Sequence, residues 1–135
     1  MTSRRAAPRG QPGTVFDTGA LIALERGDRT IVAIIAESRK AQSRITVPAG
    51  CVAQSWRDPL RQTRIAAFLR LSNVDVVSLD EADARRVGLL LARSRTTDVV
   101  DAHVAICAHR RKQSVVTSDP GDIAHLGPSL RVERI

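Results

Sequence analysis

The sequence has 135 residues, of which 43% are hydrophobic, 26% are charged and only 2% are aromatic. This length suits one domain with a buried core and is too short for two. The formal net charge of +7 favours a polyanionic partner such as RNA, DNA or an acidic protein, whereas the scarcity of aromatic residues argues against a surface that stacks bases. Because the apolar runs fall short of the roughly 20 residues that cross a bilayer, we expect a soluble, cytoplasmic protein.

Residues 1–13 differ in composition from the rest of the chain. They carry three arginines among Pro, Gly and Ala, which predicts a flexible basic tail. The remaining segment, 14–135, is the predicted domain. Its short apolar runs alternate with segments of helical periodicity in the order strand 14–17, helix 20–25, helix 29–40, strand 44–48, helix 49–57, helix beginning at 58–59, strand 74–79, helix opening at 80–83, helix 98–110, strand 114–117, helix 120–126 and strand 130–135.

Local signals support several of these helices. Asp28 is a predicted N-cap, and Asp58-Pro59 has the pattern of a cap followed by proline in the first turn. In the helix that opens at 80–83, apolar residues recur at three-four spacing, which predicts the buried face; they are Ala84, Val87, Leu90 and Leu91. Strands that read as continuous Val/Ile runs between helices predict an α/β fold, with a mostly parallel central sheet flanked by helices in a three-layer sandwich.

Two of the predicted strands end in aspartate. Asp17 follows Val15-Phe16, and Asp119 follows the 114–117 strand. Side chains at the carboxyl ends of parallel strands emerge at one edge of the sheet, where α/β proteins bind ligands. We therefore expect Asp17 and Asp119 to lie close together.

Further carboxylates come from two helix starts. Asp98 and Asp101 are three residues apart, which places both on one side of a first helical turn, and Asp122 follows Asp119 at the same interval. Each pair can also be read as a helix cap, and Asp17 as a turn residue, so both interpretations stay open for each one taken alone. Their convergence on one edge favours a site.

Clustered carboxylates repel one another and are tolerated chiefly around a cation. Oxygen ligands select Mg²⁺ or Mn²⁺ rather than zinc. A hard cation at one side of a site can activate water and neutralise a phosphate that approaches from the other side. An acidic centre in a basic chain thus predicts phosphodiester hydrolysis.

Three segments resemble motifs of the PIN-domain family, specifically the VapC-type ribonuclease toxins of bacterial toxin-antitoxin pairs, and the match spans residues 14–135. The opening VFDTGALIAL resembles the first motif and assigns metal binding to Asp17. DVVDAHVA resembles the D-A-x-I-A motif and assigns it to Asp101, with Asp98 as an outer carboxylate. VVTSDPGDI resembles the T-x-D-x-x-D motif and assigns it to Asp119. In this last motif, the supporting residues are Thr117, Ser118 and Asp122.

The chain departs from the family at one position. Where the family usually offers a glutamate on the helix after the second strand, this sequence has Gln54, whose neutral amide is a weaker metal ligand. Asp98, Glu25 or Asp58 are candidates to replace the missing charge. The resemblance implies a PIN fold, Mg²⁺- or Mn²⁺-dependent endoribonuclease activity, a homodimer, and inhibition by a cognate antitoxin. The departure favours an alternative, a catalytically weak or inactive PIN module that binds RNA or antitoxin.

Other residues carry weaker predictions. The arginines at positions 57, 61, 64 and 70, placed on the helix expected from 58–59, are either RNA-binding residues (Arg57, Arg61 and Arg64) or a solvated face. Trp56 is expected in the core or an interface rather than on a base.

Other site classes lack their signatures in the sequence. Neither Cys51 and Cys107 nor the three histidines show a C-x-x-C or H-x-x-x-H pattern, so no zinc site or disulfide framework is predicted. The elbow motif of serine hydrolases and the phosphate loop of P-loop NTPases are also missing. A receiver-type phosphotransfer domain centred on Asp17 is a third interpretation, weakened because Lys112 precedes the late strand instead of following it.

Overall fold

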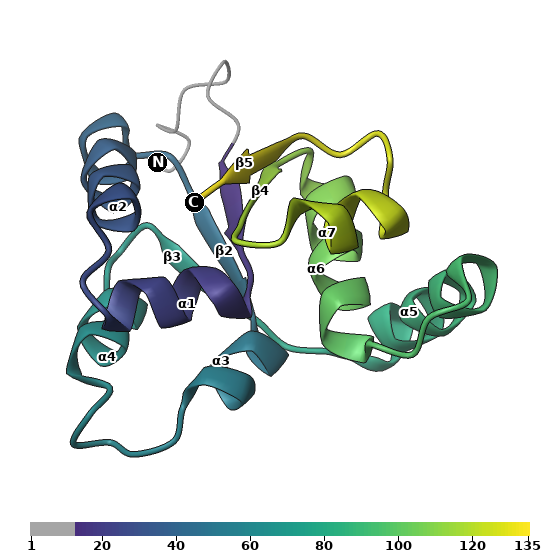
Figure 1. Ribbon diagram of the computed structural model, residues 1–135, viewed down its shortest axis with the longest axis horizontal. Helices are drawn as coiled ribbons and strands as arrows, with labels where there is room; N and C mark the ends of the chain where they lie inside the picture. The colour runs from purple at the N-terminus through teal and green to yellow at the C-terminus, as the bar shows by residue number, and fades with distance from the viewer. Residues whose placement is uncertain (1–12) are drawn as a thin grey trace, which may run out of the picture.

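A computed structural model describes residues 13–135, and Figure 1 shows a central sheet with helices on both sides. In chain order the elements are β1 (Thr14–Phe16), α1 (Thr18–Glu25), α2 (Arg29–Ala41), β2 (Ile45–Pro48), α3 (Ala49–Ser55), α4 (Thr63–Leu69), β3 (Val74–Val77), α5 (Glu81–Ser94), α6 (Val99–Arg111), β4 (Ser114–Thr117), α7 (Pro120–Leu126) and β5 (Val132–Arg134). The predicted basic tail lies outside the described residues except for Gly13, which is buried beside the carbonyl oxygen of Arg44.

All five strands of the described sheet are parallel, in the order β3-β2-β1-β4-β5. The predicted α/β class is therefore confirmed. The central strands β1, β2 and β4 are almost fully buried, which explains their continuous Val/Ile sequences. Because β1 and β4 are neighbours, their carboxyl ends adjoin at the middle of one sheet edge.

The helices form the outer layers. In Figure 1, α1, α2 and α4 lie on one side of the sheet and α5, α6 and α7 on the other, with α5 packed against α6. Phe16 of β1 stacks on Phe68 of α4 at a ring-centroid distance of 5.3 Å. On the other side, the small buried residues Ala102, Ala105 and Ala108 let α6 approach its neighbours closely.

The expected start of the helix after Asp58-Pro59 was wrong. Asp58–Arg61 make one isolated turn and α4 begins only at Thr63. The cause is Gln62, a buried side chain whose Oε1 accepts hydrogen bonds from the backbone N–H groups of Arg57 and Asp58, at 3.0 and 2.6 Å. Arg57 and Arg61 consequently lie in the connection between α3 and α4, not on a helix.

The predicted buried face of α5 was off by one residue at its start. Ala84 is exposed, and the buried residues are Asp83, Val87 and Leu90, at intervals of four and three. A carboxylate thus occupies a position that an apolar residue would normally take. Among the described residues, no helix is both long and apolar enough to span a membrane.

Candidate functional site

Asp17 lies at the carboxyl end of β1 and is only 6% exposed. It is the N-cap of α1, and its Oδ1 accepts a hydrogen bond of 2.9 Å from the backbone N–H of Ala20. Burial raises the pKa of Asp17; hydrogen bonds from the Thr117 hydroxyl and the Ala20 amide oppose that rise, and the charge of Asp119 adds to it. The carboxylate is therefore fixed in place by its hydrogen bonds and destabilised by its surroundings.

Thr117 and Asp119 reach the same edge from β4. The register pairs Phe16 with Val116, so the residues that follow them, Asp17 and Thr117, lie side by side at the carboxyl ends of the two strands. Thr117 is fully buried, and its Oγ1 accepts a hydrogen bond of 2.9 Å from the backbone N–H of Asp119. Asp119 in turn caps α7 by accepting from the N–H of Asp122 at 3.4 Å.

The first turn of α6 brings two more carboxylates. Asp98 is the N-cap and accepts a hydrogen bond of 2.9 Å from the backbone N–H of Asp101. Burial first, then the charge of Asp98 and a hydrogen bond with it, then the charges of Asp17 and Asp122, raise the pKa of Asp101 to about 6. Asp101 thus interacts with Asp98 of its own helix start and with carboxylates from two other chain segments.

Asp122, which is exposed, completes this group. The charge of Asp119, a hydrogen bond with Asp119 and the charge of Asp98 raise the pKa of Asp122. We call the whole set the acidic edge; its members are Asp17, Asp98, Asp101, Asp119 and Asp122. The capping interpretation is correct for three of them, since Asp17, Asp98 and Asp119 each cap a helix; that they also form a site stays a prediction.

A close approach of backbone segments builds this edge. A Cβ placed on Gly19 would lie 2.5 Å from Oγ of Ser118 and 3.4 Å from Oδ1 of Asp17. With the Ser118 hydroxyl in its present position, only a residue without a side chain leaves room for this approach of α1 to the β4–α7 connection. Gly19 therefore keeps Ser118 beside Asp17.

The structure also places Gln54, near the end of α3. Its Oε1 accepts a hydrogen bond of 2.5 Å from the hydroxyl of Thr18, the first residue of α1. Three residues were candidates to replace the charge missing at Gln54. Asp98 belongs to the acidic edge, whereas Glu25 and Asp58 do not. Glu25 lies at the opposite end of α1 and accepts from the backbone N–H of Ile65, and Asp58 bonds within its own turn.

A pocket of about 320 Å³ adjoins the acidic edge, within the range of small-molecule sites. Asp98, Asp101 and Asp122 supply its acidic wall, and its other polar residues, Thr96, Thr97 and His125, were not predicted from the sequence. His125 was set aside because it matched no metal motif. Its position five residues after Pro120, on the short helix α7 whose start carries Asp119, is the signal that could have found it.

The three predicted RNA-binding arginines lie near α3 and α4 and are exposed. Arg57 donates to the carbonyl oxygen of Ala53 at 3.2 Å, and Arg64 donates to that of Glu25 at 2.8 Å. Arg61 lies in the isolated turn before α4. The receiver-type interpretation is not supported, because Lys112 ends α6 at the amino edge of β4, whereas Asp17 lies at the carboxyl edge of the sheet.

The donor set of the acidic edge fits a hard divalent cation. Its carboxylate oxygens are ligands that Mg²⁺ and Mn²⁺ prefer, and the mutual repulsion that raises the pKa of Asp101 is what a cation among them would relieve. Within residues 13–135, however, only Asp83, His103 and Cys107 place three ligand atoms within 4.8 Å of one another. The acidic edge is more widely spaced, as expected for like charges that repel.

The chain is therefore an α/β protein whose sheet is all-parallel and carries a cluster of aspartates at its carboxyl edge. The model of the PIN domain matches residues 14–127. The chain belongs to the PIN-domain family. Comparison with curated protein sequences gave no match.

Several solved structures share the fold. VapBC2 from Rickettsia felis, bound to a DNA fragment from its promoter, is 16% identical with a TM-score of 0.67, over 90% of this chain and 98% of that chain. A toxin-antitoxin complex from Klebsiella pneumoniae is also 16% identical, with a TM-score of 0.63 over 91% and 100%. FitAcB from Neisseria gonorrhoeae is 16% identical, with a TM-score of 0.54 over 88% and 95%.

Proposed function

We propose that this chain is a VapC-type toxin, a Mg²⁺- or Mn²⁺-dependent endoribonuclease that hydrolyses RNA phosphodiester bonds. The observation that carries the proposal is the acidic edge, where carboxylates from β1, α6 and β4 converge in a PIN-domain chain of net charge +7. This cluster costs stability, because neighbouring carboxylates raise the pKa of Asp17, Asp101 and Asp122. Such a cost is characteristic of functional sites rather than of structural ion pairs.

Asp17, Asp101 and Asp119 would hold the cation, with Asp98 as an outer carboxylate. A divalent cation held there would supply polarisation of a phosphoryl oxygen and a lowered pKa of bound water. The chain's own residues provide rigidity: the Ala20 amide fixes the carboxylate of Asp17, and the hydroxyl of Thr117 fixes the backbone of Asp119. Ser118 and Asp122 would hydrogen-bond around the reacting phosphate or the waters beside it.

RNA would approach over the connection between α3 and α4. Arg57 and Arg61 are exposed in this connection and Arg64 is exposed in the first turn of α4, and α3 starts at the same carboxyl edge of the sheet as the acidic edge. Each phosphate that they neutralise makes binding more sensitive to salt. The pocket lined by Thr97 and His125 would receive a nucleotide next to the scissile bond.

The proposed partners are a cognate antitoxin and a second copy of this chain, in the cytoplasm. Support comes from the similar Klebsiella pneumoniae structure described as a toxin-antitoxin complex, which shares the fold over 91% of this chain. An antitoxin would have to cover the acidic edge to inhibit cleavage.

A second function is a PIN module that binds RNA or antitoxin without cleaving. It is favoured by Gln54, which brings no charge to the position and whose amide oxygen is already engaged by Thr18. Tight RNA binding without turnover in saturating Mn²⁺ would distinguish this function from the first.

The test is cleavage of a mixture of structured RNAs by the purified chain with Mg²⁺, Mn²⁺ or EDTA. Asp17→Asn keeps an oxygen for the Ala20 amide and removes the charge, so we expect a folded protein without cleavage. Asp75→Asn is the matched control, because Asp75 lies on β3, pairs with Arg44 and is outside the acidic edge. Cleavage that persists in Asp17→Asn, or that is equally lost in Asp75→Asn, would contradict the assignment.

A further inference from the structure

A second cluster of titratable side chains lies between α5 and α6. Asp83 and Cys107 are each 3% exposed and His103 is 2% exposed. Oδ1 of Asp83 accepts hydrogen bonds from Arg86 at 2.9 Å and Arg110 at 2.8 Å, whereas Oδ2 lies 3.1 Å from Nε2 of His103. The two carboxylate oxygens thus have separate roles, and the guanidinium groups occupy only one of them.

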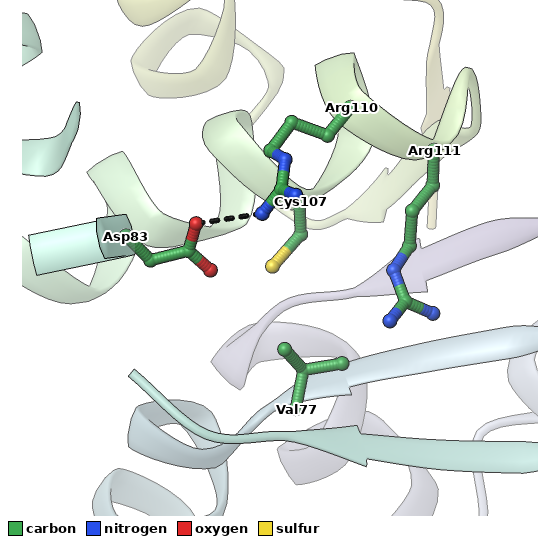
Figure 2. A pocket seen from close by; sticks show the side chains of 5 residues that line it. All are labelled: Val77, Asp83, Cys107, Arg110 and Arg111. Carbon is green, nitrogen blue, oxygen red and sulfur yellow. Dashed lines mark hydrogen bonds and ion pairs between the residues drawn. The ribbon is translucent and has the colours of Figure 1, made fainter. Parts of the chain in front are cut away.

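The ligand atoms in this cluster are already close together. His103 and Cys107 are one helical turn apart on α6, and a ligand atom from each of Asp83, His103 and Cys107 lies within 4.8 Å of the other two. Figure 2 shows the sulfur of Cys107 and the carboxylate of Asp83 pointing toward one another. Tetrahedral zinc with ordinary bond lengths needs ligand separations of about 3.3–3.7 Å, close to the observed spacing between Oδ2 and Nε2.

We propose that Asp83, His103 and Cys107 bind a transition-metal ion of the zinc class, at a site separate from the acidic edge. Thiolate and imidazole ligands favour Zn²⁺ over Mg²⁺, whereas the acidic edge offers oxygen ligands that favour Mg²⁺. Cys107 lies six residues after Asp101, which is about 9 Å along the axis of α6. The two ends of this helix segment would therefore hold different metals.

The pocket in Figure 2 provides room for a fourth ligand. It has a volume of about 140 Å³ and is lined by Asp83, Cys107, Val77, Arg110 and Arg111. This volume holds at least one water molecule, and the two arginines favour an anionic ligand there. Three protein ligands with one open position is the pattern of exchangeable zinc sites.

The charges of the proposed site balance. Binding releases the thiol proton of Cys107 to solvent, so that one thiolate and one carboxylate neutralise the divalent ion. His103 gives up its hydrogen bond to Oδ2 of Asp83, its ring proton moves from Nε2 to Nδ1, and it binds as neutral imidazole through Nε2. Arg86 and Arg110 stay on Oδ1 of Asp83, and their side chains are about half exposed, which limits their repulsion of the ion.

The test is titration of the full chain with Co²⁺, which reports thiolate ligation by a charge-transfer absorption band in the near ultraviolet. We expect the band in the native chain, its loss in Cys107→Ser, and affinity for Zn²⁺ at least about tenfold weaker in His103→Asn by chelator competition. Cys51→Ser is the matched control, since Cys51 is the other buried free cysteine. Asp17→Asn should also keep the band.

The Cys51→Ser control distinguishes a metal bound at the acidic edge from one bound at Cys107. The thiol of Cys51 lies near Thr18 and the charges of Asp17 and Asp101, so a metal bound at the acidic edge could use it. A band that is lost in Cys51→Ser and kept in Cys107→Ser would overturn the proposal. So would the lack of any band in the native chain, a result that does not depend on whether a variant folds.

Discussion

The hydroxyl of Thr18 donates a hydrogen bond of 2.5 Å to Oε1 of Gln54, although the two residues are 36 positions apart. This bond ties the start of α1 to the end of α3, beside Asp17. It also engages one of the two lone pairs of Oε1, the atom of Gln54 that could bind a metal, and leaves both amide N–H donors of the side chain for other groups that approach. A phosphate or a base suits those donors, whereas a cation does not.

Replacing Gln54 with glutamate should strengthen the acidic edge as a metal site. Gln54→Glu adds a carboxylate of nearly the same shape, which can still accept from Thr18 through one oxygen and bind a metal through the other. We expect Mn²⁺ affinity to rise about tenfold, measured by calorimetry, together with the rate of RNA cleavage at limiting metal.

Gln54→Ala separates the two roles of the native side chain. If Gln54 contributes by donating to RNA, the alanine variant binds RNA more weakly and binds Mn²⁺ with the native affinity. If Gln54→Ala lost Mn²⁺ affinity as strongly as RNA affinity, the native amide would already be a metal ligand, contrary to the geometry.

The acidic edge should make the metal-free protein sensitive to pH. Burial and the charge of Asp98 raise the pKa of Asp101 to about 6 in the folded chain, above its usual value of 3.8. The ionised form is therefore disfavoured in the fold, and stability falls as the pH rises from about 4 through about 6. With allowance for solvent screening, the loss is on the order of 1 kcal/mol.

Urea denaturation in EDTA across this pH interval measures the effect, with Asp101→Asn to isolate it. The variant should lack this component of the pH dependence, and excess Mg²⁺ should stabilise the native chain most at neutral pH, where the carboxylates are charged. If the difference in stability between the native chain and Asp101→Asn stayed constant with pH, Asp101 would not be the origin of the pH dependence.

Much of the acidic edge could be predicted from the sequence because its members lie at the ends of strands or at the starts of helices. Asp17 and Asp119 follow apolar runs short enough to be buried strands, and Asp98 precedes a long helical segment. The parallel arrangement then requires the carboxyl ends to meet at one edge. What the sequence could not show is the spacing among these carboxylates or the orientation of Gln54, since both depend on how the helices pack.

The second cluster was missed for a different reason. Helical periodicity assigns buried positions by hydrophobicity, so it placed Ala84 in the buried face of α5 and left Asp83 as a residue of the first turn. Asp83 is buried because α6 supplies its partners, His103 and Arg110, from about twenty or more residues away. Likewise, the helix predicted from Asp58 was displaced by a side chain, Gln62, that bonds to the backbone before it.

Gly19→Ala should reduce activity by moving a neighbour rather than by unfolding the chain. The new Cβ would lie 2.5 Å from Oγ of Ser118, a contact that rotation of the Ser118 hydroxyl relieves. If Ser118 hydrogen-bonds at the site, cleavage should fall about fivefold, equivalent to about 1 kcal/mol, with little change in melting temperature. The double variant with Ser118→Ala should be no less active than Ser118→Ala alone.

Gly88→Ala is the matched control for helix propensity. Gly88 lies in α5 with nothing within 4 Å of a Cβ, so alanine should stabilise the chain by up to about 1 kcal/mol and leave cleavage unchanged. Additive effects of Gly19→Ala and Ser118→Ala on cleavage would show that the two residues act independently.

Asp83→Asn should be one of the most destabilising substitutions of a charged residue in this chain. Burial alone would raise the pKa of Asp83, but hydrogen bonds from His103 and Arg86 and the charge of Arg110 outweigh it and hold the pKa below its usual value. The ionised carboxylate therefore stabilises the fold above the usual range of aspartate titration, and this contribution is lost as the pH falls through the lowered pKa. Removing the charge should cost about 2–3 kcal/mol at neutral pH, near the lower limit for a buried ion pair because both arginines can regain water.

Glu81→Gln provides the comparison on the same helix. Glu81 pairs with Arg85 at the surface, where both side chains are more than three-quarters exposed. Such a pair is worth less than about 1 kcal/mol, so urea denaturation should separate the two variants clearly at neutral pH and bring them together in strong acid, where Asp83 is protonated. Equal stabilities at neutral pH would show that the contacts of Asp83 only offset the cost of burying it. In that case α5 would be held to α6 by its apolar residues Val87 and Leu90, and the cluster would contribute its ligand atoms without contributing to the stability of the fold.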